Sequence, residues 1–180
     1  MRTISLIIVH CTANRAGSAL RMADIDRYHR SLGWKGGGYH YVIPVDGSIE
    51  AGRPEEMVGA HCRYHNRHSI GVAYVGGLSA DGSRPEDTRT EAQKRALRAL
   101  ISDLLKRYPK ALVVGHCDLD PMKPDCPGFP IKDLREACPL AFLLSNTDLT
   151  DRTDLRPVRN LSYSFSSFIP DGTELKRLNF

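Results

Sequence analysis

The chain is organised around residues 113–129, whose sequence is VVGHCDLDPMKPDCPGF. A short apolar strand over 112–114 ends in Gly-His, and the loop that follows contains three prolines and leads through Cys-Pro-Gly. Because proline fixes φ and removes a backbone donor, this loop has little freedom to form helix or strand. We expect it to hold His116, Lys123 and Cys126 in a set geometry at the end of a strand. An imidazole and a thiolate held in this way are suited to zinc.

The composition is that of an ordinary globular domain. A length of 180 residues favours one domain with an appendage, and 41% hydrophobic and 26% charged residues can support a core. The formal net charge is +4, but no run of Lys and Arg exceeds two residues, so we expect no nucleic-acid partner. The mild positive charge favours approach to an anionic polymer such as bacterial cell wall. No apolar run approaches transmembrane length, so we expect no membrane partner.

The cysteines and the N-terminus indicate synthesis in a reducing compartment. Five cysteines occur at irregular spacing, at positions 11, 62, 117, 126 and 138. An odd number without regular spacing does not form a disulfide framework, so reduced thiols are expected. The apolar stretch 6–9 is too short for a signal peptide and runs directly into His10. We therefore expect cytoplasmic synthesis without a signal peptide.

The hydrophobic pattern predicts strands separated by helices. Residues 4–9 are nearly continuously apolar and β-branched, as in a buried central strand that ends at His10. Taken alone, this histidine is either a hydrogen-bonded structural residue or a metal ligand. Further elements are predicted as strands over 39–45, 48–51, 69–74 and 111–114, and as helices over 21–32, from Thr90 to Pro109 and over 131–137. With a hairpin turn at Asp46-Gly47, this order indicates an α/β fold, a single domain with a central mixed β-sheet flanked by helices.

Two local predictions concern side-chain direction and helix capping. Strand alternation places Tyr39 and Tyr41 on one face of the sheet and His40 on the other. Thr90 is predicted to be the N-cap of the longest helix, with Gln93 completing a capping box.

Two segments carry weaker patterns. His61, His65 and His68 lie in a polar segment, and taken alone they are expected to be exposed loop residues. Residues 141–180 are rich in Ser, Thr, Asp and Arg and are predicted to be a C-terminal extension of unknown role, through which a protein partner could bind. Within this extension, residues 161–165 alternate between apolar and polar as in a strand.

Several short motifs stand in a fixed order along residues 4–134. They are IVHCTA at 8–13, GW at 33–34, GYHYVI at 38–43, DGSIEAGR at 46–53, VGAH at 58–61, HNRHSIGV at 65–72, and a final His116 followed by CPGF at 126–129. Each motif is weak alone. Together, and at this spacing, they resemble the type 2 N-acetylmuramoyl-L-alanine amidases, a zinc-dependent family that includes phage lysozyme-type amidases and the peptidoglycan recognition proteins.

The resemblance implies a metal centre and two catalytic residues. The zinc ligands of the family fall on His10, His116 and Cys126, which leaves a fourth position for water, as in catalytic zinc sites. Tyr39 matches the family tyrosine that faces the attacking water, where it can hydrogen-bond and orient it. Lys123 resembles the lysine that stabilises the tetrahedral oxyanion. Lys123 precedes the cysteine by three residues, whereas the phage relatives have two.

The resemblance also implies a substrate groove. Trp34, His61 and Asn66 match groove positions and are predicted to contact the sugar or the stem peptide. Ala73 stands where some branches of the family place a glutamate, so the tyrosine takes more of that role. Asp118 and Asp125 are either hydrogen-bond partners of the ligand histidines or exposed loop carboxylates, and the second interpretation is favoured.

The predicted function is zinc-dependent hydrolysis of the amide between N-acetylmuramic acid and L-alanine in peptidoglycan or its fragments, by an amidase domain over residues 1–140. Recognition proteins without the ligand cysteine tend to bind without cutting, so Cys126 favours an enzyme. Three alternatives stay open: a non-catalytic peptidoglycan-binding module, a hydrolase with Cys126 or Cys11 as nucleophile, and a partner-binding role, since some phage relatives also inhibit an RNA polymerase. The chain fits a phage or prophage lysis enzyme released to the wall on lysis, or a cytoplasmic wall-recycling amidase.

Overall fold

The structure is a computed structural model that describes residues 2–136. Its strands are β1 (Leu6–Cys11), β2 (Asn14–Arg15), β3 (Tyr41–Ile43), β4 (Glu50–Ala51), β5 (Ser69–Tyr74), β6 (Gly77–Leu78) and β7 (Leu112–Gly115). Its helices are α1 (Met22–Ser31), α2 (Glu91–Arg107) and α3 (Ile131–Glu136), with short 3-10 turns η1 (Asn66–His68) and η2 (His116–Asp118). The predictions for residue 137 and for residues 141–180, the strand-like 161–165 included, lie outside the described residues.

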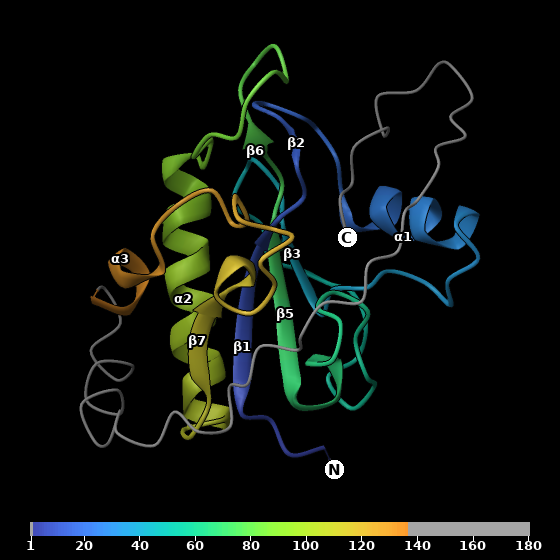
Figure 1. The fold of residues 1–180 in the computed structure, drawn as a ribbon, viewed down its shortest axis with the longest axis vertical. Coiled ribbons are helices and arrows are strands. Elements are labelled where there is room, and N and C mark those ends of the chain that lie inside the picture. The colour runs from blue at the N-terminus through green and yellow to red at the C-terminus, as the bar shows by residue number, and fades with distance from the viewer. Residues whose placement is uncertain (1, 137–180) are drawn as a thin grey trace.

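The central sheet is mixed, as predicted. Its five strands lie in the order β4-β3-β5-β1-β7, where β3, β5, β1 and β7 are parallel and β4 is antiparallel to β3. In register, Ile7 of β1 lies between Ile70 of β5 and Val113 of β7. The short strands β2 and β6 form a separate two-stranded parallel sheet near the top of Figure 1. The α/β fold class is therefore confirmed, and β1 is the central strand that carries His10.

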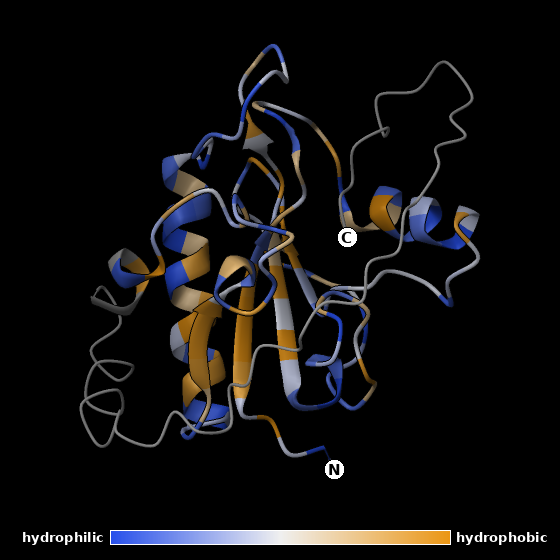
Figure 2. Ribbon diagram, in the orientation of Figure 1, coloured by the Kyte–Doolittle hydropathy of each residue, from blue (hydrophilic) through white to orange (hydrophobic). Residues whose placement is uncertain are grey.

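Helix α2 covers one face of the sheet. Its apolar stripe, with Leu97, Ile101 and Leu104 at its centre, packs on β1 and β5. The central strands of the sheet are mostly hydrophobic (Figure 2). The predicted capping box is present, because the Thr90 hydroxyl accepts from Gln93 N at 3.1 Å and the Gln93 side chain accepts from Thr90 N at 3.0 Å. Within residues 2–136, no helix has both the length and the apolar content that crossing a membrane requires.

Helix α1 covers part of the opposite face, and the prediction for Tyr39 is corrected there. Met22 and Ile25 of α1 pack in one cluster with Tyr39 and Val42, whereas Tyr41 packs on the α2 side. Tyr39 and Tyr41 therefore lie on different faces. The alternation fails because β3 begins only at Tyr41, so the two residues before it do not follow the pleat of the strand.

Candidate metal centre

The predicted ligands meet at the carboxyl ends of two neighbouring parallel strands. His10 lies near the end of β1, and His116 follows directly after β7. Each of His10, His116 and Cys126 offers one ligand atom such that all three atoms lie within 4.8 Å of one another. The His10 and His116 ring centroids are 4.5 Å apart, and Nδ1 of His10 is 3.9 Å from Sγ of Cys126. The structure thus brings together the three residues that the sequence singled out.

Short hydrogen bonds hold the loop that presents Cys126. Cys117 N donates to Cys126 O at 2.8 Å, which closes the loop back on η2. The backbone N–H of Cys11 points at Sγ of Cys126 at 3.4 Å, so the end of β1 also fixes the sulfur. The buried Tyr74 hydroxyl donates to Pro127 O at 2.8 Å from β5. The proline-containing loop is therefore tied to both central strands.

The residues at this centre fit a divalent metal ion. Burial, together with His116 and His61, lowers the pKa of His10 well below its usual value, and burial lowers the pKa of His116 to about 4. Both histidines are therefore neutral at pH 7, which is the form that binds metal. A hydrogen bond with Cys11 and burial raise the pKa of Cys126, so this thiol needs a nearby cation to ionise. Two neutral imidazoles and one thiol form a donor set that suits zinc.

Of the two predicted catalytic residues, Tyr39 lies beside His10, and Lys123 belongs to the loop that presents Cys126. The Tyr39 ring is 5.3 Å from that of His10, and burial raises the pKa of its phenol well above 10, so it remains a proton donor. Lys123 is half-buried. Burial lowers the pKa of its ammonium, and the charges of Asp120 and Cys126 act in the opposite direction.

The loop carboxylates Asp118 and Asp125 are both exposed, as the favoured interpretation expected, and no hydrogen bond from either to a predicted ligand histidine is found among the described residues. Asp118 accepts from Gly115 N at 2.8 Å and caps η2. The carboxylate that faces a ligand is Asp120, whose Oδ2 lies 3.7 Å from Nε2 of His116. That nitrogen is buried and lacks a hydrogen-bond partner among the described residues. Sequence reasoning missed Asp120, although a spacing of four residues within a turn after His116 was a usable signal.

The three predicted groove residues are placed in different surroundings. Trp34 is half-buried, and its ring lies 4.6 Å from that of His29. Asn66 uses its Oδ1 to accept from the backbone N–H groups of His61 and Cys62 at 2.9 and 3.0 Å. The expectation that His61 is an exposed loop residue is wrong, because it is only 4% exposed and lies against His10. The loop turns this ring inward, which its polar sequence does not indicate.

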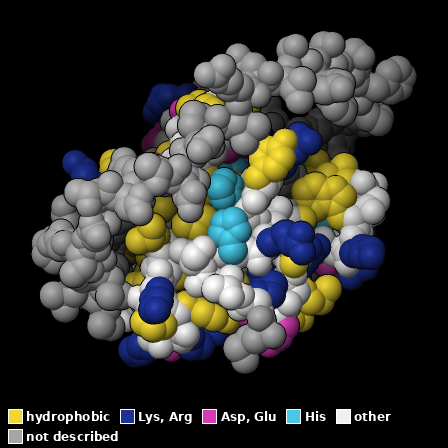
Figure 3. All heavy atoms as spheres, turned by 60° about the horizontal axis from the view of Figure 1, so that its bottom comes forward, with side chains coloured by type: hydrophobic (Ala, Val, Ile, Leu, Met, Phe, Trp, Pro, Cys, Tyr) yellow, Lys and Arg dark blue, Asp and Glu magenta, His cyan; other side chains and the backbone are white. Residues whose placement is uncertain are grey.

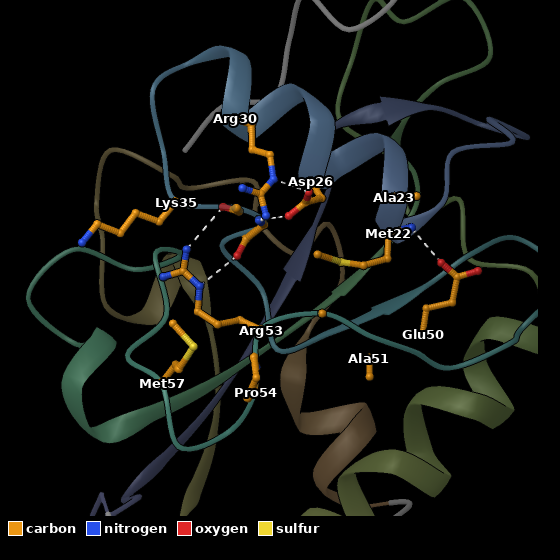
Figure 4. A pocket seen from close by; sticks show the side chains of 13 residues that line it. Met22, Ala23, Asp26, Arg30, Lys35, Glu50, Ala51, Arg53, Pro54 and Met57 are labelled. Atoms are coloured by element: carbon orange, nitrogen blue, oxygen red, sulfur yellow. Dashed lines mark hydrogen bonds and ion pairs between the residues drawn. The ribbon is translucent and has the colours of Figure 1, made fainter.

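Two features of the surface are a group of histidine side chains and one pocket. In Figure 3, histidine side chains reach the surface between hydrophobic and basic side chains. A separate pocket of about 710 Å³ lies between α1 and the segment after β4 (Figure 4). Within its wall, Asp26 forms an ion pair with Arg30, and Arg53 donates to Gly36 O and Gly37 O. The predicted ligands do not line this pocket.

Comparisons with known proteins agree with this geometry. The family model for N-acetylmuramoyl-L-alanine amidases matches residues 1–129. The endolysin of Klebsiella phage KP32 is 41% identical over 128 residues, which cover 71% of this chain and 83% of that protein. The endolysin of Escherichia phage T7 is 38% identical over 126 residues, covering 70% and 82%. The solved N-acetylmuramoyl-L-alanine amidase LysC from Clostridium intestinale URNW has a TM-score of 0.62 at 29% identity, over 75% of this chain and 85% of its own.

Fold, ligand cluster and similarity together define a class of hydrolase that acts on an amide of peptidoglycan. The chain belongs to the N-acetylmuramoyl-L-alanine amidase family. The predicted family, fold class and enzyme class are therefore confirmed.

Proposed function

We propose that the chain binds one zinc ion through His10, His116 and Cys126 and hydrolyses the amide between the lactyl group of N-acetylmuramic acid and L-alanine. The carrying observation is that two neutral imidazoles and one thiol present ligand atoms within 4.8 Å of one another at the ends of β1 and β7. Three protein ligands leave a tetrahedral position free, as in catalytic zinc sites. Bound zinc supplies Lewis-acid chemistry, lowering the pKa of water to about 7 and polarising the scissile carbonyl.

The residues around the ligands position water and stabilise charge. In the reaction, the C–N bond between the lactyl carbonyl carbon and the alanine nitrogen breaks, the carbon gains a hydroxyl group from water, and the nitrogen gains the remaining proton. Tyr39 keeps its phenolic proton and donates it in a hydrogen bond that orients the reacting oxygen. Lys123 offers a cation to the developing oxyanion, a contribution of roughly 3 kcal/mol in comparable sites. Asp120 places a carboxylate oxygen 3.7 Å from Nε2 of His116, beside this proposed ligand.

The substrate is peptidoglycan or its fragments, and the half-buried Trp34 offers a ring face to sugar or stem peptide. The relatives named endolysin favour a lysis enzyme that reaches the wall when the host cell lyses. We assign residues 1–140 to the amidase domain, in line with the family match over 1–129, and residues 141–180 to a C-terminal extension of unknown role.

The test is product analysis with the zinc-loaded chain and defined muropeptides. Mass spectrometry is expected to show a stem peptide with a free L-alanine amine and a muramic acid with a free carboxylate. A chelator is expected to abolish cleavage, and added zinc to restore it. Cleavage of a glycosidic bond or a peptide crosslink would overturn the substrate assignment. Activity that survives the chelator but not thiol alkylation would establish a cysteine nucleophile instead, and binding without any product would establish a recognition module.

A further inference from the structure

His61 is the buried neighbour of the ligand His10. Nδ1 of His61 lies 3.0 Å from Nε2 of His10, and the two rings meet edge to face, with centroids 5.0 Å apart. The other ring nitrogen of His10, Nδ1, faces Cys126 Sγ at 3.9 Å. His10 therefore presents one nitrogen to the ligand set and the other to His61. Only one arrangement of protons leaves the Nδ1 lone pair of His10 free for a metal ion, namely a hydrogen on Nε2.

The partners of His61 select this arrangement. Ser69 donates its hydroxyl hydrogen to His65 O at 2.7 Å, because a carbonyl can only accept. The Ser69 oxygen is then left as an acceptor for Nε2 of His61, which lies 3.4 Å away. With its hydrogen on Nε2, His61 has a lone pair on Nδ1 and accepts from Nε2–H of His10. The donor and acceptor roles of Ser69, His61 and His10 are thus all set by the backbone carbonyl of His65.

The ring of His61 has little room to leave this position. A Cβ atom on Gly71 would lie 2.5 Å from the ring, and a Cβ atom on Gly59 would also lie 2.5 Å from it. Both neighbours are glycine, so the ring packs directly on backbone. Asn66 holds the adjoining backbone by accepting from the N–H groups of His61 and Cys62. A ring that is 4% exposed and packed in this way is poorly placed to contact a polymeric substrate.

We infer that His61 is a positioning residue, which fixes the tautomer and ring orientation of His10 through a directed series that runs from His10 through His61 and Ser69 to His65 O. This inference rests on the proposed function, because it concerns how His10 is prepared for the metal ion. Hydrogen-bond partners of this kind change metal affinity by about 10- to 100-fold when they are removed. The role replaces the predicted substrate contact of His61 and explains why a neutral histidine is buried behind a ligand.

The first experiment compares zinc affinity in His61→Leu and His61→Asn. Leucine removes the acceptor, whereas the asparagine oxygen occupies a position near that of Nδ1 and can still accept. Competition with a chromophoric chelator is expected to give a zinc Kd about 10- to 100-fold weaker for leucine, with most of the loss recovered in asparagine. The exposed Tyr64→Phe is the matched control in the same loop and is expected to bind as wild type. Wild-type affinity in the leucine variant would overturn the inference.

The second experiment needs no variant and therefore stands even if leucine prevents folding. Nitrogen-15 NMR of the wild-type imidazoles, in the zinc-loaded protein, is expected to show His61 with its hydrogen on Nε2 and His10 protonated only on Nε2. A hydrogen on Nδ1 of His61 would overturn the inference. The two proposals fail differently. If the wild type binds no zinc, the proposed function falls, whereas zinc binding that does not depend on His61 removes only the positioning role.

Discussion

The acid stability of the fold depends on two buried histidines that accept backbone hydrogen bonds. Gly38 N donates to Nδ1 of His29, and Gly71 N donates to Nδ1 of His40, both at 2.9 Å. Burial is the main cause that lowers the pKa of each histidine from 6.5 to about 4. Protonation of Nδ1 would place a ring N–H opposite the backbone N–H that now donates to this nitrogen. Both rings are therefore neutral in the folded state.

The magnitude follows from proton binding in the two states. Between pH 6.5 and about 4, the unfolded chain binds more protons than the folded one, so the contribution of each histidine is complete above this window and is lost as the pH falls through it. At pH 5, preferential proton binding by the unfolded chain shifts the unfolding equilibrium toward the unfolded state roughly 30-fold per histidine. This amounts to about 2 kcal/mol of the free energy of unfolding relative to pH 8. Both together remove about 4 kcal/mol, a large part of the stability of a typical domain.

The assay is urea unfolding, followed by circular dichroism at pH 8 and pH 5, for the wild type, His29→Asn and His40→Asn. Asparagine can accept the backbone hydrogen bond but does not titrate. The difference in unfolding free energy between the two pH values is expected to shrink by about 2 kcal/mol in each variant, whatever its absolute stability. Titrations shared by all variants cancel in this comparison, and the exposed Tyr64→Phe is expected to match the wild type. An unchanged difference in both asparagine variants would refute the reasoning.

Three further predictions test the loop, the cap and the oxyanion site. Asn66→Ala removes the acceptor of two backbone N–H groups and is expected to lower the free energy of unfolding in urea by about 2 kcal/mol. Asn66→Asp keeps an acceptor oxygen and is expected to retain most of the wild-type stability. Equal losses in both variants would contradict the assigned bonds. Thr90→Ala is expected to lower the free energy of unfolding by about 1 kcal/mol and with it the thermal midpoint, whereas Thr90→Ser is expected to keep the wild-type midpoint. An unchanged midpoint in the alanine variant would argue against the cap. Lys123→Met is expected to lower kcat by roughly 100-fold with zinc content unchanged; wild-type turnover would remove the lysine from the mechanism.

Much of the fold follows from local sequence. The continuous apolar run of β1 can only be a strand covered on both faces, and all six of its residues are buried. The capping box of α2 is also local, since Thr90 and Gln93 are three residues apart. The faces of Tyr39 and Tyr41 were not predictable, because they depend on where β3 begins, and pairing with neighbouring strands decides that boundary.

The site shows the same division between ligands and their support. The proline-rich loop after a strand pointed to His116 and Cys126, and the resemblance to the amidase family added His10, so all three predicted ligands were named before the structure showed them together. Their neighbours Asp120 and His61 were not identified as such from the sequence. Asp120 reaches His116 only because η2 turns the chain, and His61 reaches His10 only because a polar loop folds its ring onto glycine. The first contact is local, and its spacing of four residues is a usable signal, whereas the second depends on tertiary packing, which spacing along the chain does not encode.

Zinc content together with muropeptide cleavage, measured on the same samples of wild type, Cys126→Ala and Cys117→Ala, tests the central claim most directly. Cys117 is the matched control, because it is a half-buried thiol in the same loop that takes no part in the ligand cluster. The proposed centre predicts one zinc ion per chain and full cleavage in the wild type and in Cys117→Ala, with both lost in Cys126→Ala. Cleavage at the wild-type rate by metal-free Cys126→Ala would contradict it.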